Sequence, residues 1–212
     1  MIPALGSRQH LRVGLLGGSF NPAHAAHREI SLTALHRLEL DQVWWLVSPQ
    51  NPLKSRSGMM PLGRRVAQAQ AVADHPAIHV TDLERRLDTR YTVDTLARLR
   101  LHYPNMQFVW LMGADNLAQF HRWHAWQDIA HTMPIAVLDR PGFNLRAART
   151  PAGQWLSRYR IAQHEAGVLA DQEAPAFLLL KSKLNPLSAT AIRQTAARKT
   201  MAGQKTKRRT AT

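Results

Sequence analysis

Apolar runs of strand length alternate with stretches of helical period along almost the whole chain. This alternation predicts parallel strands joined by right-handed helical crossovers, and therefore an α/β fold: a doubly wound parallel sheet with helices on both faces. The expected strands are residues 12–17, 42–48, 78–81, 107–113, 134–139 and 176–180. The expected helices are residues 24–38, 61–74, 92–103, 116–132 with a break, 153–163 and 189–197, and residues 141–151 are expected to be a flexible connection.

Length and charge indicate how many domains the chain can form and which partners it favours. Its 212 residues suffice for one α/β domain with a full core, which we expect to span residues 1–197. Residues 198–212 carry six Lys and Arg residues, no acidic residue and no apolar period, so we expect a basic, disordered tail. The net charge of +14 favours anionic partners such as phosphate compounds, with nucleic acid limited to non-specific contacts of the tail.

Cysteine usage and hydropathy bear on the compartment. Cysteine is absent, which suits the reducing cytoplasm. No apolar run reaches the roughly 20 residues that a membrane helix needs. We therefore expect a cytoplasmic protein without membrane contacts.

A turn with two glycines joins the first expected strand to the first expected helix. Gly17 and Gly18 end the strand, and their lack of a side chain lets a backbone approach a phosphate closely. The helix N-terminus offers free N–H groups and a partial positive charge to the same anion. His24 and His27 are three residues apart and so lie on one face of the first turn. These features predict a nucleotide-phosphate site; the alternative is a plain turn with two surface histidines.

Two further segments are suited to phosphate. Ser188 can cap the helix that follows it, Thr190 falls in its first turn, and Arg193 lies on nearly the same face, where its guanidinium can bind phosphate through two hydrogen bonds. An ordinary capped helix with a surface arginine is the alternative. In residues 49–54 two prolines stiffen a loop that leads to Lys54, whose ammonium can bind a phosphate. The alternative is a lysine that is simply solvated on the loop.

The third and fourth expected strands also lead into polar helix starts. Thr92 is expected to cap a helix whose free N–H groups can hold a carboxylate. Asp115 follows the fourth strand, at a place suited to a hydrogen bond with a ribose hydroxyl. Of the tryptophans beyond it, Trp126 is expected to anchor the core.

The motifs, in this order, resemble those of the nucleotidyltransferase superfamily and especially of bacterial nicotinate mononucleotide adenylyltransferases. The histidine pair resembles the (T/H)xGH signature with Ala26 in place of the usual glycine, and residues 187–193 resemble I-S-A-T-x-I-R with Leu187 leading. The loop to Lys54 resembles P-x-N-x-P-H-K with Leu53 in place of the histidine. Residues 83–96 resemble E-x-x-R-x-x-x-S-Y-T-x-D-T-L, and residues 113–126 resemble G-A-D-N-L-x-x-F-x-x-W-x-x-W.

This resemblance covers residues 13–198 and implies a Rossmann-like fold. It implies transfer of the adenylyl group of ATP to nicotinate mononucleotide, giving deamido-NAD and pyrophosphate in NAD biosynthesis. Mg²⁺ would be the cofactor, carried by the ATP phosphates and not by a metal site of the protein. Without a paired nucleophile and base, we expect catalysis by alignment and charge stabilisation, with no covalent intermediate.

The resemblance also assigns residues. The implied catalytic residues are His24, His27, Lys54 and Arg193. The implied ATP-binding residues are Gly17, Gly18, Ser19, Phe20, His24, His27, Asp115, Ser188, Thr190 and Arg193. The implied nicotinate mononucleotide-binding residues are Ser19, Asn51, Lys54, Tyr91, Thr92 and Trp123, whose indole would stack on the pyridine ring.

Several alternatives stay open. Another small adenylyltransferase, with nicotinamide mononucleotide or phosphopantetheine as acceptor, would share the histidine pair. A basic nucleic-acid-binding protein is favoured by the net charge, although the aromatic residues cluster near one helix start and do not alternate with basic ones. A catalytically inactive nucleotide sensor is a third alternative. Arg140 suits a contact with the nucleotide and the closing of a loop equally well.

Overall fold

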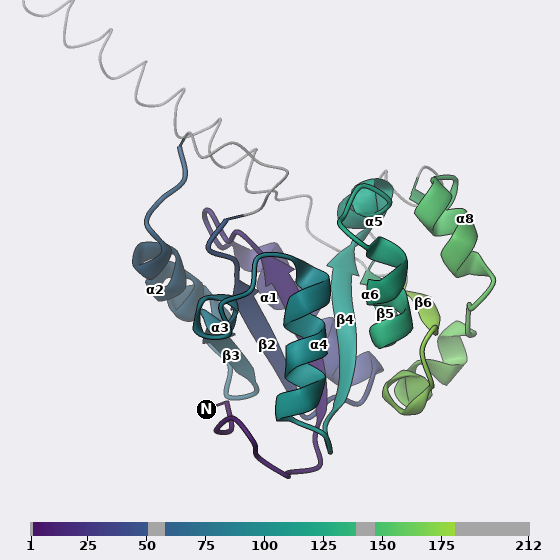
Figure 1. Ribbon diagram of the computed structural model, residues 1–212, viewed down its shortest axis with the longest axis horizontal. Helices are drawn as coiled ribbons and strands as arrows, with labels where there is room; N and C mark the ends of the chain where they lie inside the picture. Colours follow the sequence, from purple (N-terminus) through teal and green to yellow (C-terminus); the bar gives the residue numbers. More distant parts are fainter. Residues whose placement is uncertain (1, 51–57, 139–146, 181–212) are drawn as a thin grey trace, which may run out of the picture.

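The fold is a single parallel sheet, seen in a computed structural model that describes residues 2–50, 58–138 and 147–180. Six strands lie in the order β3-β2-β1-β4-β5-β6 (Figure 1). They are β1 (Arg12–Gly18), β2 (Gln42–Val47), β3 (Ile78–Thr81), β4 (Gln107–Gly113), β5 (Ile135–Leu138) and β6 (Phe177–Leu180). The chain adds strands outward from β1 to β3 and then returns to the centre at β4. The expected doubly wound, Rossmann-like sheet is confirmed.

Helices cover both faces of this sheet (Figure 1). One face carries α1 (Ala25–Arg37), α2 (Leu62–Ala73) and the 3₁₀ helix η1 (Gln163–Asp171). The other carries α3 (Leu83–Arg86), α4 (Thr92–His102), α5 (Ala114–Phe120), α6 (Trp126–Thr132) and α8 (Pro151–Ser157). Across the described ranges, no helix combines the length and apolarity needed to cross a membrane.

The central strands are apolar on both sides because both sides are covered. Trp44 and Trp45 are neighbours in β2, point into opposite cores and are both 0% exposed. Strands buried on both faces are therefore continuous apolar runs and not alternating ones. Full burial of one large apolar side chain contributes about 1.5–3 kcal/mol, so the two tryptophans help to hold both helical layers on the sheet.

Most predicted elements lie within two residues of the observed ones, and the break predicted within residues 116–132 separates α5 from α6. The helix predicted over residues 153–163 is wrong in its second half. α8 ends at Ser157, and the chain then runs beside β6: the Phe177 N–H donates to the Tyr159 carbonyl at 2.8 Å, and the Ile161 N–H donates to the Phe177 carbonyl at 2.9 Å. This pairing with a distant strand ends the helix, and the hydrophobic period of a single segment does not predict such a contact.

Other differences concern short elements. The sequence did not predict α3 or η1, and Pro151, expected in a flexible connection, is the first residue of α8. Thr150 caps that helix, since its Oγ1 accepts from the Gly153 N–H at 3.3 Å. The helix predicted over residues 189–197, the tail and the domain boundary before it lie outside the described residues and stay predictions.

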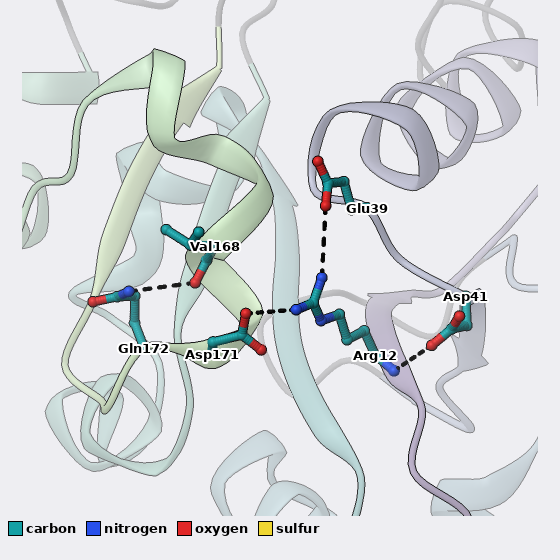
Figure 2. A network of polar contacts seen from close by, with 6 residues as sticks. All are labelled: Arg12, Glu39, Asp41, Val168, Asp171 and Gln172. Atoms are coloured by element: carbon teal, nitrogen blue, oxygen red, sulfur yellow. Dashed lines mark hydrogen bonds and ion pairs between the residues drawn. The ribbon is translucent and has the colours of Figure 1, made fainter.

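An ion-pair network ties β1 to two distant segments (Figure 2). The guanidinium of Arg12 lies 2.6 Å from the Asp171 carboxylate in η1 and 3.7 Å from the Glu39 carboxylate after α1. The Arg12 N–H also donates to Asp41 Oδ2 at 2.7 Å. Arg12 begins β1, so the network lies at the end of the sheet opposite the strand ends that carry the glycine turn.

Candidate active site

The candidate site lies where β1 and β4 end side by side. Successive strands are added in opposite directions from this pair, and in such sheets ligands bind outside the carboxyl ends of the strands at this point. α1 begins after β1, and α5 begins directly after β4. The structure thus brings the glycine turn, the histidine pair and Asp115 to one edge of the sheet, as predicted.

Gly17 has a packing reason to lack a side chain. A Cβ on Gly17 would lie 2.4 Å from Cη2 of Trp110 in β4, which is closer than atoms can approach. At Gly18 the nearest atom to such a Cβ would be 3.3 Å away, on the Phe20 ring. Gly17 therefore lets Trp110 pack beneath the turn, and its predicted contact with phosphate would be through the backbone.

The two histidines form a close pair at the start of α1. His24 is the N-cap residue and is 6% exposed, while His27 is the third helical residue. Their ring centroids are 3.9 Å apart, and the His24 N–H donates to Nδ1 of His27 at 3.2 Å. Because Nδ1 accepts, the neutral His27 ring carries its proton on Nε2, which makes Nε2 a hydrogen-bond donor.

A buried layer supports this pair. Phe20 has a φ of 45°, is 2% exposed and stacks on Trp45 with ring centroids 5.1 Å apart, while its ring lies 4.8 Å from that of His27. The Trp45 Nε1–H donates to Ser31 Oγ at 2.7 Å, and Ser31 Oγ donates to the His27 carbonyl at 2.9 Å. The Phe20 side chain is thus part of the core, so its predicted ATP contact would be through the backbone.

Sequence analysis did not identify Arg65, which is buried beside the glycine turn. It lies in the first turn of α2, is 1% exposed and donates four hydrogen bonds to backbone carbonyls. Nη1 donates to Ser19 and to Ser48, each at 2.7 Å, Nη2 to Pro49 at 3.0 Å, and Nε to Met60 at 2.9 Å. An arginine in a helical stretch gives no local signal of such contacts.

Glu84, in α3, is a buried acidic residue whose charge acts on this arginine. It is 8% exposed, and its burial raises the pKa of its carboxyl to about 7, while a hydrogen bond with Ser48 and the charge of Arg65 act in the opposite direction. Burial lowers the pKa of Arg65, and Glu84 opposes that shift. The pair therefore lies under the carboxyl ends of β2 and β3, beside the candidate site.

The start of α4 differs by one residue from the prediction. Tyr91, not Thr92, is the N-cap residue, and Thr92 is the first helical residue. Tyr91 takes that place because its carbonyl accepts from the Thr95 N–H at 3.2 Å and from Thr95 Oγ1 at 3.2 Å. The Tyr91 ring lies 4.3 Å from the ring of His124, so the start of α4 faces the loop after α5.

That loop carries Trp123. Its indole is half-buried and meets Phe120 and Trp110 edge to face, with ring centroids 5.4 and 6.2 Å apart. Trp126 packs in the same way on Phe120 at 5.8 Å and on Trp155 at 5.4 Å, so it packs against the core as predicted, and like Trp123 it is only partly buried. Trp123 differs because the loop that holds it contacts Tyr91, a predicted ligand-binding residue, through His124.

The remaining predicted residues lie outside the described part of the chain: Asn51, Lys54, Arg140, Ser188, Thr190 and Arg193. Within the described part, no group of three or more His, Cys, Asp or Glu side chains could hold a metal ion. The site therefore consists of imidazoles, helix N-termini and a glycine turn, all of which suit phosphate oxygens.

Comparison with known proteins bears directly on this arrangement. A family model described as cytidylyltransferase-like matches residues 15–195. A relative from Bradyrhizobium sp. (strain ORS 278), named "Probable nicotinate-nucleotide adenylyltransferase", is 54% identical over 183 residues, which cover 86% of this chain and 95% of the relative. The chain belongs to the nicotinate-nucleotide adenylyltransferase family.

Further relatives of this adenylyltransferase family agree. One of the same name from Erythrobacter litoralis (strain HTCC2594) is 55% identical over 184 residues, covering 87% of this chain and 84% of the relative. Among solved structures, the Plasmodium falciparum nicotinic acid mononucleotide adenylyltransferase complexed with NaAD matches with a TM-score of 0.65 over 87% of this chain and 83% of its own, at 16% identity. At that identity the likeness concerns the fold.

Proposed function

We propose that this protein transfers the adenylyl group of ATP to nicotinate mononucleotide, giving deamido-NAD and pyrophosphate, a step of NAD biosynthesis. The observation that carries the proposal is the close pair of the buried His24 and the half-buried His27 at the N-terminus of α1, at the point between β1 and β4 where the strand order reverses. Relatives 54–55% identical over most of their length carry the name of this activity.

The reaction needs alignment more than proton transfer. A phosphate oxygen of the mononucleotide bonds to the α-phosphorus of ATP. The bond from that phosphorus to the bridging oxygen breaks, and the electron pair leaves with pyrophosphate. Since the nucleophile is already an anion, no general base is required, and in-line positioning with charge stabilisation carries the rate.

We assign the stabilisation of the developing charge to the histidine pair. In our proposal His24 and His27 donate to phosphate oxygens of ATP, and the N-terminus of α1 adds the N–H groups that its helix leaves unpaired. The His27 ring can donate through Nε2 because the His24 N–H already occupies Nδ1. Lys54 and Arg193 would hold the remaining phosphates, and Asp115 a ribose hydroxyl.

Mg²⁺ fits this site as an ion carried by the nucleotide. The donor set of imidazoles and N–H groups suits phosphate oxygens, and the described residues form no carboxylate cluster that would hold the ion. When bound to the triphosphate, Mg²⁺ neutralises charge on the departing pyrophosphate.

The acceptor would lie between α4 and the loop after α5. The free N–H groups at the start of α4, near Tyr91 and Thr92, can receive the nicotinate carboxylate. The half-buried indole of Trp123 offers a face to the pyridine ring. We further propose that ATP and this mononucleotide are the partners, that nucleic acid meets at most the basic tail, and that the protein works in the cytoplasm.

Pyrophosphate release with ATP and Mg²⁺ tests the proposal. The purified protein is assayed in parallel with nicotinate mononucleotide, nicotinamide mononucleotide and phosphopantetheine. We expect turnover with the nicotinate compound alone. Turnover with phosphopantetheine alone would overturn the acceptor, and absence of turnover with all three would favour a nucleotide sensor or a nucleic-acid binder. A nucleic-acid binder would show binding that weakens steeply with salt.

A further inference from the structure

Arg65 connects two loops that border the candidate site. Ser19 belongs to the glycine turn after β1, and Ser48 and Pro49 follow the end of β2 at Val47, in the segment that leads toward the predicted Asn51 and Lys54. One nitrogen, Nη1, donates to Ser19 and to Ser48 at the same distance of 2.7 Å. A single side chain thus fixes the separation of the two loops.

Almost all N–H groups of the Arg65 guanidinium donate hydrogen bonds to these segments. It has five N–H groups, and four of them donate to carbonyls of Ser19, Ser48, Pro49 and Met60. Its planar, rigid fork makes the four bonds at fixed angles, so the carbonyls cannot shift without losing bonds. A lysine could reach only part of this set, because its ammonium is a single point on a flexible stem.

Stability alone does not explain a buried arginine here. A positive charge in the first turn of a helix opposes the helix dipole, and burial of an ion pair is often no more stabilising than burial of apolar residues of the same size. Glu84, in α3, is close enough for its charge to oppose the lowering of the Arg65 pKa, although burial raises the pKa of its own carboxyl to about 7. Three of its four hydrogen bonds hold carbonyls of the two loops, so the arrangement fixes the geometry of these loops in addition to whatever it contributes to the free energy of folding.

Asn21 adds a second tie between the same segments. Its Nδ2 donates to the Gly58 carbonyl at 3.0 Å, and its Oδ1 accepts from the Met60 N–H at 3.2 Å. Met60 is also bonded to Arg65. The glycine turn, the end of β2 and the start of α2 thus share one buried network.

We infer that Arg65 is a positioning residue for adenylyl transfer: it sets the distance between the glycine turn that would hold ATP and the β2 loop that leads to the acceptor-binding residues. This inference rests on the proposed function. Since a misplacement of about 1 Å can cost on the order of 100-fold in rate, loss of the fork should lower kcat far more than it raises KM.

The test compares Arg65→Lys and Arg65→Gln with Arg64→Gln, a control at the neighbouring exposed arginine of the same helix turn. For Arg65→Lys we expect kcat for pyrophosphate release to fall roughly 10- to 100-fold, with both KM values within about threefold of the unsubstituted protein. Arg65→Gln should lose as much or more, and Arg64→Gln should match the unsubstituted protein.

Hydrogen–deuterium exchange supplies a readout that does not depend on activity. In Arg65→Lys, peptides covering residues 18–22 and 47–50 should exchange faster, while a peptide covering residues 113–120 should not change.

An unchanged kcat together with unchanged exchange at both loops would overturn the inference, as would uniformly faster exchange across the chain, which indicates a general stability role. If the unsubstituted protein releases no pyrophosphate, the proposed function fails, and the exchange result still decides whether Arg65 fixes the loops.

Discussion

The backbone N–H of His24 donates to Nδ1 of His27 at 3.2 Å, across the first turn of α1. Main-chain geometry therefore decides which nitrogen of the His27 ring carries the proton in its neutral form. The N-cap residue of the helix prepares the neighbouring imidazole as a donor through Nε2. The same turn that caps α1 thus orients a proposed catalytic group.

Replacement of His27 by Asn separates these two functions. The Asn side chain retains an acceptor within reach of the His24 N–H but has no donor at the position of Nε2. We expect kcat to fall by roughly 10²–10³, as for loss of one preorganised donor, while the free energy of unfolding changes little. Steady-state pyrophosphate release and urea unfolding measure both, with His36→Asn, at an exposed position of the same helix, as control. Full activity in His27→Asn would remove His27 from the mechanism.

Glu84 makes stability depend on pH. Burial raises the pKa of its carboxyl to about 7, so the folded chain holds this proton more tightly than the unfolded chain does. Stability from this group is complete below the unfolded pKa, near 4.5, and is lost as pH rises through about 7. The loss amounts to at most about 3.5 kcal/mol, since the pKa differs by about 2.5 units and each unit corresponds to about 1.4 kcal/mol.

Glu84→Gln isolates this contribution. Urea unfolding from about pH 5 to about pH 8, a range that spans the titration of Glu84 in the folded protein, gives the free energy of unfolding of both proteins. Subtracting one free energy of unfolding from the other at each pH removes the contributions of all groups that titrate in both proteins, and leaves that of Glu84. We expect the unsubstituted protein to lose stability relative to Glu84→Gln as the pH rises. A difference that stays constant over this range would contradict the raised pKa.

A side chain at Gly17 should clash with Trp110. In Gly17→Ala the new Cβ would lie 2.4 Å from Cη2 of the indole, so the packed indole or one of the two strands must shift. We expect a loss of about 1–3 kcal/mol in the free energy of unfolding, as for other overpacked sites. Trp110→Phe provides space, so the double variant should be more stable than the sum of the two single changes predicts. Strict additivity would show that the clash is relieved in some other way.

Ser31 holds the layer beneath the histidines. Ser31→Ala leaves the buried Trp45 Nε1–H without the acceptor that it has at 2.7 Å. We expect thermal and urea unfolding to show a loss of about 1–3 kcal/mol, the usual cost of an unpaired buried donor. Thr33→Ala, two residues along the same helix, serves as control. Equal stability of the two variants would mean that Ser31 does not carry the layer.

Much of the candidate site could be predicted from local sequence. The Gly17–Gly18 turn lies at the end of a largely buried strand, and His24 and His27 stand at helical spacing, so their proximity follows once the segment forms the predicted helix. The start of α4 was misplaced by one residue, because backbone contacts of Tyr91 with Thr95 decide which residue is the N-cap. A sequence pattern cannot tell which of two adjacent residues is the N-cap, because that depends on the backbone dihedral angles of a single residue.

The sequence by itself determined the alternation of strands and helices, and hence the parallel sheet, because hydrophobic period is a local property that each segment carries alone. It also determined which strand ends carry the residues that we predict to bind phosphate. Only the tertiary structure decided the role of Arg65, whose partners Ser19 and Ser48 lie 46 and 17 positions away along the chain. The same holds for Trp110, which fills the space beside Gly17 from another strand. Such contacts depend on how separate segments are packed together, and no local pattern encodes that distance.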